Sequence, residues 1–187
     1  MLVPIIFDIS LIFLFKYLGF FAYNLGRLIG DPISFDIALP IGISFFTFHH
    51  VMYLTDLRRG EAPRYDLVRY GLYISFFPQV LAGPLVRWRE IMHQFDERPY
   101  LRPDAAERIA SGLILLTIGL AKKVLLGDPL AEYANSVFAA AAEGKVISLV
   151  EAWQATLAFT FQIYFDFSGY TDMALGLALL FGIVLPQ

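Results

Sequence analysis

A polar stretch set between two apolar runs constrains the fold of this chain more than any other feature. Residues 155–165 and 173–185 are predominantly apolar, and the residues between them carry acids and hydroxyls. These side chains include Asp166, Ser168, Tyr170 and Asp172. An unpaired acid is costly in hydrocarbon, so such groups usually face a bundle interior or a wet cavity. Because the backbone can break at Ser168-Gly169, we expect two membrane helices meeting at a polar elbow. A short loop at the membrane surface is the alternative.

The composition extends this interpretation to the whole chain. Of 187 residues, 58% are hydrophobic and only 17% are charged, which is typical of a multi-pass membrane protein. We expect an all-α fold, with residues 1–187 forming a single membrane domain. A net charge of −3 without a long basic run does not suggest a nucleic-acid partner. The absence of cysteine excludes a Cys nucleophile, a thiolate metal site and disulfides.

Two further apolar segments carry ionisable side chains in the N-terminal third. Residues 2–21 are long enough to span a bilayer, and there we expect Asp8 near an interface and Lys16 extending to one. Within the second span, residues 41–54, His49 shares one helical arc with Tyr53 and with Asp56 just beyond it.

A face of this kind could hold an imidazole in one tautomer for proton transfer. We favour the alternatives, a hydrogen-bonded seam between helices or two histidines at a membrane surface. His49 and His50 are adjacent rather than four apart, so we expect no metal site.

Arginines predict how residues 70–86 meet the membrane. One basic cluster precedes this apolar piece and another follows it, beginning at Arg87. A full crossing would put the clusters on opposite sides, against the positive-inside tendency. Pro78 and the Gly83-Pro84 step also interrupt the segment, so we expect it to be re-entrant or tangential. Arg87 and Trp88 would then lie at an interface, where headgroup anchoring is the commoner role of arginine.

The remaining apolar pieces predict further helices. Residues 109–126 form a span that we expect to end at Gly127-Asp128-Pro129, with Lys122 and Lys123 reaching back to the interface. Residues 131–144 have the spacing of an exposed amphipathic helix, and residues 147–165 form another span.

Four stretches, taken in order, resemble the membrane-bound O-acyltransferase family in its alginate O-acetylation branch. They read LPIGISFFTF (39–48), FPQ with AGPLVR (77–79 and 82–87), GLAKKV (119–124) and YFDFSGYTDMA (164–174). The resemblance implies an integral enzyme of the bacterial inner membrane that moves an acyl group, acetyl above all, toward the hydroxyls of an exopolysaccharide such as alginate. It implies a cytoplasmic thioester donor such as acetyl-CoA, contact with membrane lipid, and a periplasmic acetyltransferase as partner.

The resemblance also implies a tunnel lined or braced by polar side chains. The candidates are His49, Arg87 near the cytoplasmic mouth, Asp166, Ser168, Tyr170 and Asp172. The family's catalytic histidine lies downstream of the last motif, so we expect it beyond Gln187 and assign no catalytic residue. No bound cofactor or metal is expected. Two alternatives remain open: an ion- or proton-conducting transporter that uses such residues as a path, and an inactive fragment.

Overall fold

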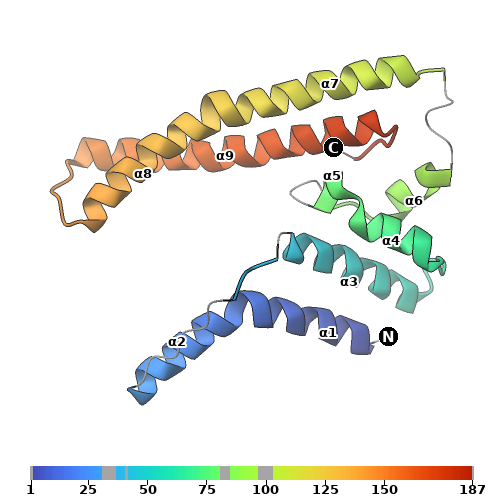
Figure 1. Cartoon of the computed structure of the whole chain (residues 1–187), viewed down its shortest axis with the longest axis horizontal. Helices are drawn as coiled ribbons and strands as arrows, with labels where there is room; N and C mark the ends of the chain where they lie inside the picture. The colour runs from blue at the N-terminus through green and yellow to red at the C-terminus, as the bar shows by residue number, and fades with distance from the viewer. Residues whose placement is uncertain (1, 31–36, 41, 81–84, 97–102, 187) are drawn as a thin grey trace. The chain divides into compact units, whose positions relative to one another are not determined.

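The described chain is built from helices. The computed structural model describes residues 2–30, 37–40, 42–80, 85–96 and 103–186. Within these ranges there is no strand, which confirms the all-α expectation (Figure 1). Backbone contacts divide the described residues into two compact units, one ending at Asp96 and one running from residue 103 to Leu185. Each unit is described by itself.

The first unit begins with a long apolar helical segment. Helix α1 (Leu2–Ile12), the π turn η1 (Phe13–Tyr17) and α2 (Leu18–Ile29) follow one another, and α2 ends at Gly30 with a φ of 88°. The apolar stretch Val3–Ile29 is 27 residues long, longer than predicted, and has the length and composition of a membrane span. The change of direction between α1 and α2 (Figure 1) lies at the π turn, a common site of helix bending.

The described part of this unit contains four further helices. They are α3 (Ile43–Arg59), α4 (Leu67–Ser75), α5 (Phe77–Val80) and α6 (Trp88–Asp96). The predicted interruption near Pro78 is present, because Phe76 is extended and Pro78 falls in the first turn of α5, where a missing N–H is tolerated. Gly83-Pro84 lies outside the described residues, and the re-entrant path stays a prediction.

The second unit is a helical hairpin. Helix α7 (Ala105–Ala121), the π turn η3 (Lys122–Gly127) and α8 (Asp128–Ala142) form one helical arm, and α9 (Leu149–Leu180) forms the other. The first arm, Ala105–Ala142, is 38 residues long and is the second segment with the length and composition of a membrane span. The predicted end at Gly127-Asp128-Pro129 is therefore wrong. The π turn accommodates Pro129, whose missing N–H would interrupt a regular α-helix.

The predicted elbow at Ser168-Gly169 is also wrong, because α9 is helical throughout. Gly169 packs against the other arm instead: a Cβ added at Gly119 would lie 2.5 Å from the Gly169 carbonyl oxygen. The pair Gly112 and Gly176 repeats the arrangement, with a Cβ at Gly112 lying 2.8 Å from the Gly176 carbonyl oxygen. Small residues let membrane helices approach this closely, so these glycines serve packing and do not break the helix.

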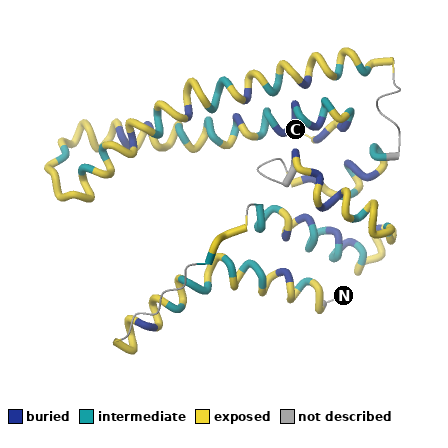
Figure 2. The backbone as a smooth tube through the Cα atoms, viewed as in Figure 1, coloured by how far each residue is buried: buried dark blue, intermediate teal, exposed yellow. Residues whose placement is uncertain are grey.

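Burial along the helices agrees with this interpretation. Buried positions are widely spaced, and much of the helical surface between them is exposed (Figure 2). On α9 the buried residues are mainly alanine and glycine, whereas large apolar side chains such as Trp153, Phe161 and Phe167 are exposed. Large apolar groups outside and small ones at the helix contact are typical of membrane helices.

Candidate functional site

The buried face of α3 holds a polar cluster. His49, Tyr53 and Asp56 are buried together, as their helical spacing predicts. His49 is fully buried, with Nδ1 2.8 Å from the Phe45 carbonyl oxygen and Nε2 3.3 Å from the Val86 amide nitrogen. A carbonyl oxygen only accepts and an amide only donates, so the imidazole is neutral with its proton on Nδ1. Both ring nitrogens are used by the main chain, which supports the seam interpretation.

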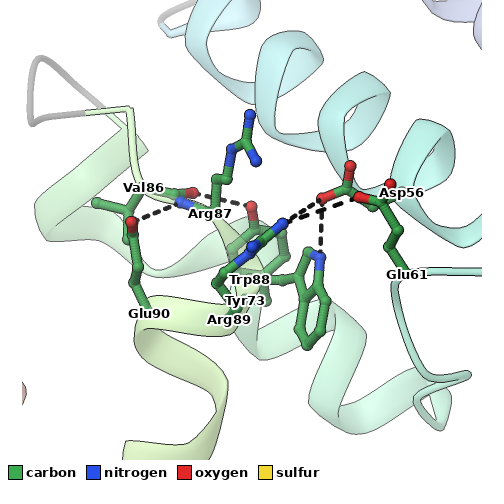
Figure 3. Close-up of polar contacts among 8 residues, drawn as sticks. All are labelled: Asp56, Glu61, Tyr73, Val86, Arg87, Trp88, Arg89 and Glu90. Atoms are coloured by element: carbon green, nitrogen blue, oxygen red, sulfur yellow. Dashed lines mark hydrogen bonds and ion pairs between the residues drawn. The ribbon is translucent and has the colours of Figure 1, made fainter.

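Both main-chain polar groups of Val86 are hydrogen-bonded in this cluster. Its amide donates to His49. Its carbonyl accepts from the Tyr73 hydroxyl at 3.0 Å (Figure 3). The Val86 side chain is fully buried. Helices α3 and α4 therefore fix the backbone immediately before Arg87.

The residues after Arg87 are tied to Asp56. The Trp88 indole N–H donates to Asp56 at 3.0 Å, and the Arg89 guanidinium lies 3.9 Å from both Asp56 and Glu61 (Figure 3). A buried carboxylate needs partners of this kind. The sequence could not reveal these partners, because they come from a segment far along the chain.

Arg87 itself has a free side chain on this fixed backbone. Its amide donates to Glu90 at 3.0 Å, while its side chain is exposed. Figure 3 shows the guanidinium pointing away from Asp56, and no described residue forms an ion pair or hydrogen bond with it.

A second buried acid in this unit corrects another expectation. Asp8 is only 2% exposed, and its Oδ2 lies 2.6 Å from His50 Nδ1. Helix α1 packs on α3, so Asp8 faces a protein partner and not an interface. The cost of burying an unpaired charge accounts for this placement.

The second cluster lies between the arms of the hairpin, where η3 meets α9. Lys122 Nζ is 2.6 Å from Asp172 Oδ2 and 2.9 Å from Ser168 Oγ. Lys123 Nζ is 2.7 Å from both Asp166 and Asp128. The expectation that these lysines reach back to the interface is wrong, because carboxylates on the facing helix satisfy them in place. The sequence signal for this pairing was the presence of lysines in one apolar segment and aspartates in the next.

The predicted site residues thus fall into two groups. His49 and Arg87 belong to the first unit and are linked through Val86. Asp166, Ser168 and Asp172 meet the lysines of the second unit. Tyr170 is 44% exposed, and its hydroxyl bonds to none of the described residues.

Comparison of the sequence with known proteins identifies the family. The sequence matches the profile of MBOAT, the membrane-bound O-acyltransferase family, over residues 5–185. It is 35% identical to a probable alginate O-acetylase, AlgI, of Pseudomonas aeruginosa, over 97% of this chain and 35% of the relative. It is also 35% identical to a peptidoglycan O-acetyltransferase of Helicobacter pylori, over 100% of this chain and 40% of the relative.

A more distant relative is named for the transfer of a different acyl group, D-alanyl. The chain is 26% identical to a teichoic acid D-alanyltransferase of Bacillus subtilis, over 79% of this chain and 36% of the relative. The chain spans well under half the length of each of these relatives. With the profile matched along nearly all of its length, the chain belongs to the membrane-bound O-acyltransferase family.

Proposed function

We propose that the protein takes part in the transfer of an acetyl group from a cytoplasmic thioester, such as acetyl-CoA, to polysaccharide hydroxyls at the bacterial inner membrane. The observation that carries the proposal is 35% identity, across nearly the whole chain, to relatives named as O-acetylating enzymes. Identity to the D-alanyltransferase is only 26% over 79% of the chain, which favours acetyl over D-alanyl. A periplasmic acetyltransferase would receive the group and pass it to the polysaccharide.

The chemistry sets what each residue would do. A hydroxyl attacks the thioester carbonyl, a base takes the hydroxyl proton, hydrogen-bond donors stabilise the oxyanion, and the thiolate leaves. We do not assign the base to His49, because the main chain engages both of its ring nitrogens. In this proposal His49 is a positioning residue that fixes the backbone beside Arg87.

Arg87 would bind the phosphates of the donor at the cytoplasmic mouth of the tunnel. A guanidinium suits phosphate because it presents several donors in a rigid plane. The rigid backbone around Arg87 and the absence of a described partner support this role, since little ordering remains to be done on binding.

Inside-out vesicles carrying the protein as its gene encodes it, and supplied with radiolabelled acetyl-CoA, test the proposal. We expect label to pass to a polysaccharide acceptor or to a periplasmic acetyltransferase. Arg87→Gln should raise KM for acetyl-CoA roughly tenfold, the loss of one charged hydrogen-bonded contact. Arg59→Gln, a change in the other basic cluster, should leave KM unchanged. Proton flux without any acyl product would contradict the proposal and favour a transporter.

A further inference from the structure

Ser168 differs from the other aliphatic hydroxyls of α9. Thr156, Thr160 and Thr171 each donate to the carbonyl four residues earlier, at 2.8, 2.8 and 3.0 Å. This is the usual arrangement for a hydroxyl inside a helix. Ser168 instead accepts a hydrogen bond from Lys122 at 2.9 Å, and its own O–H bonds to none of the described residues.

Asp172 holds the lysine that makes this contact. It lies 2.6 Å from Lys122 Nζ, one turn of α9 beyond Ser168. The ammonium therefore bridges a carboxylate and a hydroxyl, with both side chains only partly exposed. An ammonium has three donors and no lone pair, so Lys122 cannot take the Ser168 proton and does not make the serine a nucleophile. It draws electron density from the hydroxyl oxygen and strengthens the O–H as a donor.

We propose that Ser168, held by Lys122 and Asp172, is a ligand-binding hydroxyl that donates to the carbonyl oxygen of an acyl group. The inference rests on the proposed function for the identity of that ligand. The geometry does not depend on the proposed function: Ser168 accepts a hydrogen bond from the Lys122 ammonium, and its own O–H bonds to none of the described residues. No bond is made or broken at Ser168; it stabilises negative charge as it develops on the carbonyl oxygen.

Thiol chemistry tests the geometry without an activity assay. Residues 1–187 contain no cysteine, so Ser168→Cys introduces the one thiol among them, in place of the hydroxyl. Thr171→Cys is the matched control, because Thr171 is also partly exposed but is bonded to its own helix. A neighbouring ammonium stabilises a thiolate. In native membranes, the thiol at position 168 should therefore react with iodoacetamide roughly fivefold faster at pH 7 than the thiol at position 171.

Two changes at Lys122 complete this test. Lys122→Met should abolish the rate difference, and Lys122→Arg, which keeps the charge if the first variant fails to fold, should preserve it. Labelling that fails at position 168 while position 171 reacts, or a rate that does not respond to loss of the charge, would overturn the inference.

Acetyl transfer in the vesicle assay then tests whether the ligand of Ser168 is the acyl carbonyl. Ser168→Ala should lower kcat roughly 100-fold with little change in KM, as expected for a donor used mainly in the transition state. Thr171→Val should stay within about twofold of the wild type. Wild-type kinetics in Ser168→Ala would overturn the inference and leave the proposed function intact. An inactive wild-type protein would overturn the proposed function, while the labelling result would still decide the geometry.

Discussion

His49 shows how a histidine in an apolar helix can be fully occupied by the main chain. The imidazole joins Phe45 in its own helix to Val86 in a distant segment. It thereby satisfies an amide at a residue with no exposed surface. Its importance for any reaction would be indirect, through the placement of Arg87.

Replacing His49 should therefore cost stability. In His49→Ala the Val86 amide loses its acceptor while it remains buried, which costs about 1–3 kcal/mol. His93→Ala is the control: His93 is exposed and, among the residues that the structure describes, is within bonding distance of the Arg89 carbonyl of its own helix alone. The free energy of unfolding of His93→Ala should stay within about 0.5 kcal/mol of the wild type. Thermal unfolding in detergent measures both variants, and equal shifts would contradict the role assigned to His49.

The sequence could predict part of this cluster. Helical periodicity places His49, Tyr53 and Asp56 on one face, and the structure buries that face. The sequence could not show that His49 bonds to a main-chain amide, because every residue except proline has such an amide. The alternatives of seam and proton relay were separable only once the partners of both nitrogens were known.

At the scale of the element, α9 shows why a glycine among polar residues is an ambiguous signal. The same pattern suits a helix break and a close helix contact. The facing helix decides between these two interpretations. Gly112 and Gly119 of α7 contact Gly176 and Gly169 of α9, respectively, and this alignment can be seen only in the structure. The unbroken helix then places Asp166, Ser168 and Asp172 toward the lysines.

A methyl group at this contact should separate the two helices. Gly119→Ala would place its Cβ 2.5 Å from a main-chain oxygen, so the backbones must move apart. We expect a loss of about 1–3 kcal/mol in stability, the usual cost of overpacking. Gly71→Ala in α4 is the control, because its added Cβ would meet nothing within 4 Å, and alanine favours a helix by up to about 1 kcal/mol. Destabilisation by both changes alike would show that the close approach is not the cause.

At the scale of the whole molecule, three acids placed in apolar helices follow one rule: each faces a nitrogen-bearing side chain of another element. Asp8 pairs with His50, Lys122 with Asp172, and Lys123 with Asp166. Each pair joins two elements of the same unit. The sequence predicted a membrane protein from its apolar runs, yet it placed Asp8 and both lysines at interfaces because the partner of a charge cannot be read from one helix alone.

This pairing is what we expect of the proposed acyltransferase more than of a transporter, the alternative that the sequence left open. A proton path needs acids that can gain and lose charge, whereas Asp166 and Asp172 here are counter-ions of lysines. Fixed ion pairs suit a scaffold that positions Ser168, as the acyltransferase account requires. The internal pairing of charges is therefore its central structural claim.

Exchanging the charges of one pair tests that claim most directly. Lys122→Asp and Asp172→Lys should each destabilise the protein in detergent, because each places like charges opposite one another across the 2.6 Å contact. The double variant should recover at least half of the summed loss, a coupling of about 1–3 kcal/mol. Losses that simply add in the double variant would contradict pairing between the two arms of the hairpin.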